Sequence, residues 1–312
     1  MSLYYYLTAS SEEENELRRM EARALFGTEG GGGALLSEAK IDPSRSPFLK
    51  LRVDVRFEAA DLSGIAEQAA TLDLAGATFK VLALDNGATG EDGKFDYGEK
   101  RAMEREIGGR MRGTADMREP DRIFGFARAG GRWLFGECAM GEAVWLRHND
   151  KPRKYSTALS TRVARAVANI AVPRPEGVRA IDPCCGIGTV LVEARSMGID
   201  IVGREINPLA ATGARENLAY FGYGDTKVTL GDMREIEETY DVAIVDLPYN
   251  LCSVLPDGEK LAMLRSARRF ARRVVLVTVE DVDRFVAGAG FAIVDRCGVS
   301  KGKFVRTVLV CE

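Results

Sequence analysis

The chain has 312 residues, enough for two domains of ordinary size, and its 46% hydrophobic and 29% charged content is typical of a globular protein. No apolar run approaches the roughly eighteen residues of a membrane helix, and a formal charge of -3 excludes a global attraction to nucleic acid. The N-terminal MSLYYYLTASSEEENE lacks the features of a signal peptide, so we expect a cytoplasmic protein.

Cysteine and histidine content argues against a metal centre. The six cysteines include no C-x-x-C pair, and His148 is the single histidine. We therefore expect reduced thiols and no structural metal. Cys184 and Cys185 are predicted to be small buried hydrophobic residues.

The first half of the chain predicts an α+β region. Aromatic and β-branched residues indicate strands at residues 3–9 and 48–57, and a helix is expected over Glu12–Phe26. The EGGGG run at 29–33 precedes no Lys-Ser or Lys-Thr, which favours a loop over a phosphate cradle. The remaining expected elements are a helix within 61–74, a strand at 78–87, a helix within 97–113 broken at its glycines, and two strands joined by a glycine turn at 122–140.

Arginines in and after the third of these helices are candidate phosphate contacts. Glutamates are interspersed among them, so an ordinary solvated helix face is an equally good interpretation and both stay open. The arginines are Arg101, Arg105, Arg110, Arg112, Arg118 and Arg122, and the glutamates are Glu99, Glu104 and Glu106. Trp145 and His148 are expected to pack between the two halves of the chain.

From Thr157 onward, helical and β-rich segments alternate strictly. This order predicts right-handed crossovers and a parallel sheet covered on both faces. The last segment, 291–312, contains two strands joined by GVSKGK and predicts an antiparallel hairpin. One antiparallel strand would then lie in an otherwise parallel sheet.

A glycine-bearing loop follows the first strand of this half, in AIDPCCGIGTVLVEA. The strand ends in Asp182, and Gly186 and Gly188 allow a ligand to approach the backbone at a helix N-terminus. A dinucleotide fingerprint needs glycine or alanine where Leu191 stands, so a nicotinamide cofactor is disfavoured.

Acidic residues end the next two strands. Glu205 lies about twenty residues beyond the glycine loop, where doubly wound folds place a carboxylate for ribose hydroxyls. Asp232 and Met233 follow the next strand and suit an adenine amine and an apolar ring face. Ribose and adenine without a pyrophosphate site indicate S-adenosyl-L-methionine.

These motifs resemble those of class I S-adenosylmethionine-dependent methyltransferases, whose D-x-x-x-G-x-G pattern the loop matches. The resemblance implies a Rossmann-like α/β domain with a seven-stranded, mostly parallel sheet and an antiparallel seventh strand. It also implies that Asp182, Gly186 and Gly188 surround the methionine moiety, with Glu205 on ribose and Asp232 on adenine.

The fourth strand ends in DVAIVDLPYN, residues 241–250. Taken alone, this is a strand followed by a Pro-containing turn. It resembles the [Asp/Asn/Ser]-Pro-Pro-[Tyr/Phe/Trp] pattern of methyltransferases that act on exocyclic base amines. On this mapping Asp246 accepts from the amine, Leu247 offers its carbonyl, Pro248 sets the geometry and Tyr249 stacks on the base. Cytosine C5 methylation would need a cysteine where Tyr249 stands.

The segment RKYSTALSTRVARAVANIA, residues 153–171, resembles a region of THUMP-containing tRNA guanosine-N2 methyltransferases. In that family the region lies beside the cofactor, which implies contacts from Tyr155, Ser156 and Thr157. The resemblance implies a ferredoxin-like and THUMP-like RNA-binding region at 1–150 and a methyltransferase domain at 151–312.

The sequence thus leads to the hypothesis of an RNA methyltransferase that acts on guanosine N2 in tRNA. Alternatives are methylation of adenine N6, of guanine N2 in ribosomal RNA or of a protein glutamine. A non-catalytic RNA-binding protein that keeps the fold is a further alternative, for which Leu247 in place of proline would be the first sign.

Overall fold

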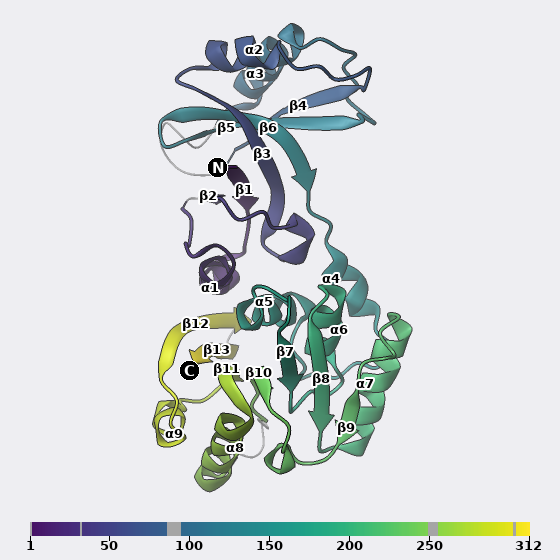
Figure 1. Ribbon diagram of the computed structural model, residues 1–312, viewed down its shortest axis with the longest axis vertical. Coiled ribbons are helices and arrows are strands. Elements are labelled where there is room, and N and C mark those ends of the chain that lie inside the picture. The colour runs from purple at the N-terminus through teal and green to yellow at the C-terminus, as the bar shows by residue number, and fades with distance from the viewer. Residues whose placement is uncertain (1, 32, 86–94, 249–254, 302–303) are drawn as a thin grey trace. The chain divides into compact units, whose positions relative to one another are not determined.

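Two units make up the chain in the computed structural model, which describes residues 2–31, 33–85, 95–248, 255–301 and 304–312 (Figure 1). Unit 1 contains Met1–Ala9 and Thr28–Glu142, and unit 2 contains Ser10–Gly27 and Ala143–Glu312. None of the helices in the described ranges is long and apolar enough to cross a membrane.

Unit 1 is a six-stranded sheet with the order β2-β1-β3-β6-β5-β4. Neighbouring strands pair antiparallel except β4 and β5, which are parallel. The strands are β1 (Tyr4–Thr8), β2 (Ala34–Ser37), β3 (Leu49–Ala59), β4 (Phe79–Ala83), β5 (Arg122–Ala129) and β6 (Arg132–Met140). The predicted glycine turn is confirmed, because Gly130 and Gly131 join β5 to β6 with φ of 59° and 75°, values that favour glycine.

The helices α2 (Leu62–Ala69) and α3 (Tyr97–Arg110) share an apolar core with β4, β5 and β6. The prediction that α3 breaks at its glycines is wrong, because the helix runs through Gly108 and Gly109. A capping box of Asp96 and Glu99 starts the helix, and buried Ile107 anchors its last turn in the core. Packing therefore outweighs the low helix propensity of two glycines.

Strand and helix alternate through most of unit 2 as predicted, but only a 3-10 turn, Met233–Glu235, separates the strands Val228–Leu230 and Tyr240–Asp246. The strands are β7 (Arg179–Asp182), β8 (Asp200–Glu205), β9 (Val228–Leu230), β10 (Tyr240–Asp246), β11 (Ala271–Thr278), β12 (Ile293–Lys301) and β13 (Phe304–Cys311). The main helices are α5 (Thr161–Ala171), α6 (Thr189–Ser196), α7 (Pro208–Tyr220), α8 (Asp257–Phe270) and α9 (Asp283–Gly288). A short helix, α4 (Val144–Arg147), comes before α5.

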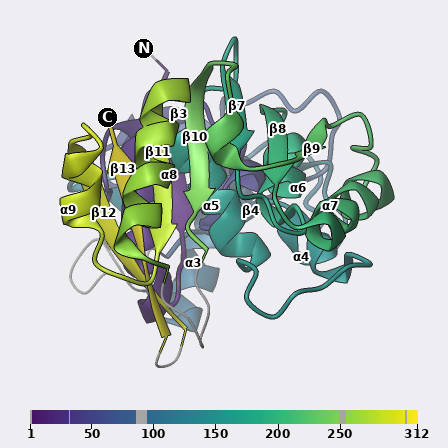
Figure 2. The ribbon, with the colours of Figure 1, turned by 90° about the horizontal axis from the view of Figure 1, so that it is seen from below.

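The sheet of unit 2 has seven strands in the order β12-β13-β11-β10-β7-β8-β9 (Figure 2). β13 alone runs opposite to the other six strands, and its antiparallel pairing with β12 confirms the predicted hairpin. The chain moves from β7 toward β9 in one direction and from β10 toward β11 in the other. Right-handed crossovers therefore place α6 and α7 on one face and α8 on the opposite face.

The helix α1 (Asn15–Phe26) lies between β1 and β2 in the sequence but belongs to unit 2. Arg23 forms a two-bond ion pair with Asp295 of β12, with both N···O distances 2.8 Å. Buried Glu21 accepts from the Asn169 amide of α5 at 2.7 Å. These contacts hold α1 against the same unit as the cavity described below.

Trp145 and His148 pack inside unit 2. The His148 ring lies 2.7 Å from Glu193 Oε1, and Arg165 donates to the other Glu193 oxygen at 2.8 Å. The Arg165 guanidinium lies over the Trp145 ring, 5.6 Å from its centroid. These contacts place both residues in a buried cluster within unit 2, and packing between the two halves of the chain stays a prediction.

Leu247 directly follows β10, and its contacts give a structural reason for a leucine at this position. Its N–H donates to the Val277 carbonyl at 3.0 Å, a bond that proline could not form. Its side chain is 5% exposed and belongs to an apolar core with Met263 and Leu264 of α8. The residue that departs from the Pro-Pro pattern thus has a structural role.

Replacing Leu247 with proline should destabilise unit 2 by about 2–4 kcal/mol, since a buried hydrogen bond and apolar contact are both lost. Urea unfolding followed by hydrogen–deuterium exchange of peptides from β10 and β11 measures this free energy. Leu247→Met keeps the N–H and the volume and should cost less than about 1.5 kcal/mol. A proline variant as stable as the parent chain would contradict this explanation.

Candidate functional site

A cavity of about 1090 Å³ opens at the carboxyl ends of β7, β8 and β10. Ligands of open α/β sheets bind at this edge, because the loops that leave the strands surround a common hollow. Ten of the predicted site positions line this cavity. The lining positions from the predictions are Tyr155, Thr157, Asp182, Gly186, Glu205, Asp232, Met233, Asp246, Leu247 and Pro248.

The glycine loop connects Asp182 to α6. Gly186 lines the cavity with φ of 53°, and no heavy atom lies within 4 Å of the position a Cβ would take. Gly188 is the N-cap of α6 and does not line the cavity. Its φ is 79°, and a Cβ there would meet Ala214 of α7 at 3.1 Å. Gly186 therefore keeps the cavity side of the loop open, whereas Gly188 allows α6 and α7 to approach each other.

Glu205 connects the ends of β7 and β8. Its carboxylate accepts from the Gly186 N–H and the Asn207 N–H, each at 2.8 Å. Its own carbonyl accepts from the Gly231 N–H at 2.9 Å. Main-chain donors thus fix the carboxylate, which is 8% exposed, at the rim of the cavity.

Asp182 is buried at the end of β7 with few compensating contacts. Its Oδ1 accepts from the Cys184 N–H at 3.2 Å. Burial raises the pKa of this carboxyl well above its ordinary value, the Cys184 N–H opposes the shift, and Asp246 and Glu205 add to it. A hollow with converging carboxylates attracts cationic groups and hydrogen-bond donors.

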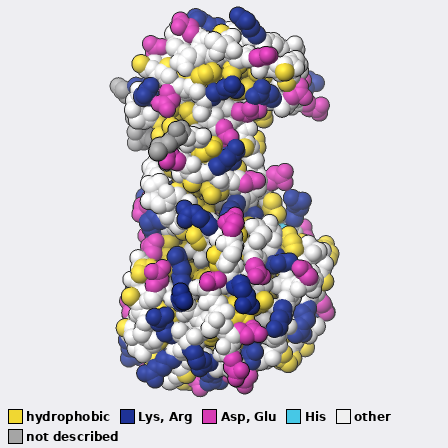
Figure 3. All heavy atoms as spheres, viewed as in Figure 1, with side chains coloured by type: hydrophobic (Ala, Val, Ile, Leu, Met, Phe, Trp, Pro, Cys, Tyr) yellow, Lys and Arg dark blue, Asp and Glu magenta, His cyan; other side chains and the backbone are white. Residues whose placement is uncertain are grey.

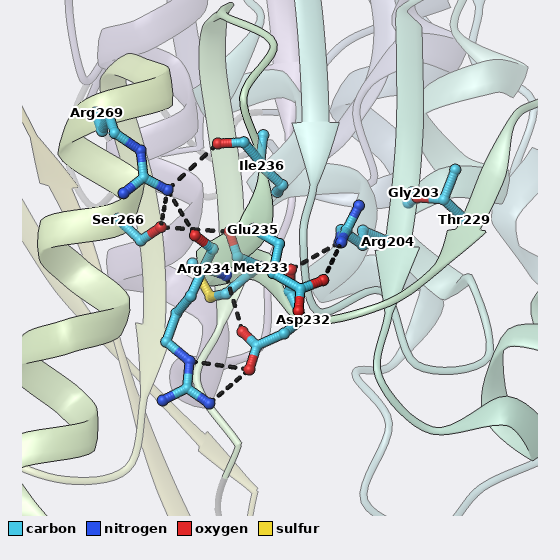
Figure 4. Close-up of polar contacts among 10 residues, drawn as sticks. All are labelled: Gly203, Arg204, Thr229, Asp232, Met233, Arg234, Glu235, Ile236, Ser266 and Arg269. Atoms are coloured by element: carbon cyan, nitrogen blue, oxygen red, sulfur yellow. Dashed lines mark hydrogen bonds and ion pairs between the residues drawn. The ribbon is translucent and has the colours of Figure 1, made fainter.

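Asp232 and Met233 begin a short 3-10 turn, Met233–Glu235 (Figure 4). The Asp232 carboxylate accepts from Arg234 Nε at 2.9 Å and from Arg234 Nη2 at 2.5 Å. These bonds lower the pKa of Asp232. Arg234 also donates to Glu259 at 2.7 Å, so a charged chain follows this wall of the cavity.

Residues 153–158 form the wall that faces α7. Tyr155 and Thr157 line the cavity and Ser156 does not. Asn217 of α7, which the sequence did not single out, accepts from the Arg153 N–H at 2.9 Å and donates to its carbonyl at 3.0 Å. The same amide nitrogen lies 2.8 Å from the Ile187 carbonyl. A fully buried amide therefore ties this segment to the glycine loop.

Asp246 ends β10 inside the cavity, and its Oδ1 has no hydrogen-bond partner among the described residues. Burial raises the pKa of this carboxyl to about 7, and the positive charge of Arg306 opposes the shift. A carboxyl with this pKa exchanges a proton near neutral pH, which suits a general base. Pro248 follows at the exposed rim. Tyr249, Asn250 and Cys252 lie outside the described residues.

Burial disfavours the thiolate form of the two cysteines in the glycine loop. Burial raises the pKa of Cys184 and of Cys185 well above the ordinary value, and the nearby carboxylates raise both further. The thiolate needed for covalent attack is therefore disfavoured. The Cys184 sulfur lies 3.6 Å from the Met233 sulfur, in line with the predicted apolar role.

Several arginines predicted as phosphate contacts have acidic partners within unit 1. Arg101 pairs with Glu104 at 2.8 Å, and Arg122 pairs with Glu137 at 2.6 Å. Figure 3 shows Lys and Arg side chains interspersed with Asp and Glu over the face in view. These pairs favour the solvated-face interpretation for Arg101 and Arg122.

Comparison with known proteins identifies similar chains. Residues 148–283 match the family model described as RMKL-like, methyltransferase domain. Over 116 residues the chain is 35% identical to the tRNA (guanine(10)-N2)-dimethyltransferase of Methanothermobacter thermautotrophicus, covering 36% of this chain and 34% of that protein. Over 149 residues it is 28% identical to the U6 snRNA (guanine-N(2))-methyltransferase THUMPD2 of Mus musculus, covering 43% and 27%.

The matched segment spans about a third of the length of these curated relatives. Among solved structures, TrmN from Thermus thermophilus has a TM-score of 0.51 at 20% identity and covers 99% of both chains, which shows a common fold. Residues 148–283 of this chain are therefore similar to RMKL-like methyltransferase domains.

Proposed function

We propose that the protein transfers a methyl group from S-adenosyl-L-methionine to N2 of guanosine in RNA, and that this RNA is tRNA. The observation that carries this proposal is Asp246, which ends β10 in the cavity and whose buried Oδ1 has no hydrogen-bond partner among the described residues. Two of the curated relatives are named for guanine N2 in tRNA and in U6 snRNA.

The residues of the cavity fit this cofactor. Asp182 and the open space over Gly186 suit the cationic methionine half, and Glu205 suits the ribose hydroxyls. Met233 and the Asp232 carboxylate suit the adenine ring and its amine. When bound, the cofactor supplies an electrophilic methyl group on a positively charged sulfur.

The chain's own residues prepare the base amine. A guanine amine is a weak nucleophile because its lone pair is delocalised into the ring. Asp246 accepts one amine hydrogen and takes the proton as the new N–C bond forms, and the Leu247 carbonyl accepts the other hydrogen. Pro248 restricts the backbone at the rim, and we assign stacking on the base to Tyr249.

Residues 1–150 are proposed as the RNA-binding region, with a ferredoxin-like and a THUMP-like part. The mostly antiparallel sheet of unit 1, with helices α2 and α3, supports an α+β domain of this kind. Arg105, Arg112 and Arg118 are its candidate phosphate contacts. A non-catalytic RNA-binding protein is disfavoured, because the Leu247 contacts give a structural reason for the leucine and it need not be a sign of lost catalysis.

Incubating the protein with tritiated cofactor and separate pools of tRNA, ribosomal RNA and DNA tests the reaction. Nucleoside analysis should recover the label as N2-methylguanosine from tRNA. Label in N6-methyladenosine, or only in ribosomal RNA, would move the assignment to another amine. Cofactor binding without transfer to any pool would contradict the proposed catalysis.

Substituting Asp246 with asparagine should lower kcat by about 10²–10⁴-fold, the usual contribution of a general base, while cofactor affinity stays within about threefold. In the parent enzyme kcat/KM should rise about tenfold per pH unit below about 7 and level off above it, because the base must be deprotonated. The residual activity of Asp246→Asn should lack this dependence. An unchanged pH profile in the variant would remove Asp246 from proton transfer.

Glu205→Gln should weaken S-adenosylhomocysteine binding by about 1.5–3 kcal/mol, since a hydrogen bond to a charged group is lost. Isothermal titration calorimetry measures the change. Glu238→Gln is a suitable control, because Glu238 bonds to Tyr240 at 2.6 Å and does not line the cavity. Equal affinities of the parent and Glu205→Gln would contradict the ribose assignment.

A further inference from the structure

Side chains from two neighbouring elements hold the main chain of the turn that carries Asp232 and Met233 (Figure 4). Arg204 of β8 donates from Nε to the Asp232 carbonyl at 2.7 Å. From α8, Ser266 donates to the Met233 carbonyl at 3.3 Å, and Arg269 donates to the Arg234 carbonyl at 2.6 Å. The main-chain conformation of the turn is therefore fixed by side chains of β8 and α8 and does not depend on a bound ligand.

Arg204 also contacts the glycine loop. Its own carbonyl accepts from the Cys185 N–H of the glycine loop at 3.0 Å, whereas its side chain reaches the Asp232 turn. Its Nη2 also donates to Glu235 at the end of that turn, at 2.8 Å. A single residue thus binds both loops that flank Glu205.

The backbone at Gly231 is shaped to admit this guanidinium. Gly231 has φ of 152°, a value that favours glycine. A Cβ at this position would lie 2.5 Å from Arg204 Nη2 and 2.9 Å from its central carbon. The Arg204 side chain is 19% exposed, so it is mostly shielded from solvent.

We propose that Arg204 is a positioning residue for the adenosine half of the cofactor. It acts through the Asp232 carbonyl and Glu235, and so fixes where the Asp232 carboxyl and the Met233 side chain meet the adenine. Arg234 binds the Asp232 carboxylate, whereas Arg204 binds the Asp232 main-chain carbonyl. The two arginines therefore hold different parts of the same residue. This inference rests on the proposed binding of S-adenosyl-L-methionine.

Arg204→Gln tests the proposal, with Arg215→Gln as the matched control. Arg215 of α7 donates from Nε and Nη2 to the Val228 carbonyl at 3.2 and 2.8 Å, the same kind of bond on the adjoining strand β9. Arg215 does not line the cavity. Both variants therefore lose an arginine bond to a main-chain carbonyl, and only the bond of Arg204 holds the Asp232 turn.

Calorimetry should give a Kd for S-adenosylhomocysteine that is about tenfold higher in Arg204→Gln and within about twofold of the parent in Arg215→Gln. The loss should be equal for 5′-methylthioadenosine, which lacks the amino-acid group. In the methylation assay the KM for cofactor should rise by a similar factor, while kcat at saturating cofactor stays within about twofold.

Unchanged affinity in Arg204→Gln, or an equal loss in both variants, would overturn the proposal, and so would a loss confined to kcat. A loss that disappears with 5′-methylthioadenosine would also overturn it. If Arg204→Gln does not fold, Gly231→Ala takes its place and should give the same tenfold loss, because its Cβ displaces the guanidinium. A parent protein that binds neither ligand would instead refute the proposed function.

Discussion

The arrangement of the site depends on one constraint, the meeting of carboxylates at the carboxyl edge of a parallel sheet. Asp182, Glu205 and Asp246 end three strands whose order in the sheet brings them to a single cavity. Each carboxylate has a different set of donors. Glu205 has two main-chain N–H groups, Asp182 has one, and Asp246 Oδ1 has none among the described residues. The number of hydrogen-bond donors therefore distinguishes Glu205, a carboxylate fixed for binding, from Asp246, a carboxyl that can exchange a proton.

The loops around these carboxylates are held mainly by bonds to main-chain atoms. Glu205 binds the glycine loop, Arg204 binds the Asp232 turn, and Asn217 joins the glycine loop to the segment at Arg153. Bonds to main-chain atoms fix a loop and leave the side chains that face the cavity available to a ligand. A preformed hollow loses less conformational entropy when a ligand binds.

Much of this arrangement could be predicted from sequence, because it depends on local pattern. Strand and helix alternate with clear periodicity, and the spacing from Gly186 to Glu205 to Asp232 follows from the length of each crossover unit. The prediction that α3 breaks at Gly108 and Gly109 was wrong, since tertiary packing through Ile107 outweighs propensity. The residue types at 204 and 217 carry no local signal, because arginine and asparagine are common on helices and strands.

Leu247 shows the same limit at the centre of the site. In the sequence it is a departure from a motif, and only its N–H bond to Val277 and its place in the core give the reason. The assignment of α1 to unit 2 likewise depends on contacts such as Arg23 with Asp295, which are 272 positions apart. Non-local pairs of this kind leave no periodic trace in a single sequence.

The account depends most on the protonation of Asp246, and NMR titration of protein labelled with ¹³C at the aspartate carboxyl groups measures it directly. Comparison with Asp246→Asn identifies the signal. The account predicts a carboxyl that titrates with a pKa of about 7. Titration near the ordinary aspartate value of about 4 would mean that the carboxyl is solvated or paired, and would contradict its role as the base.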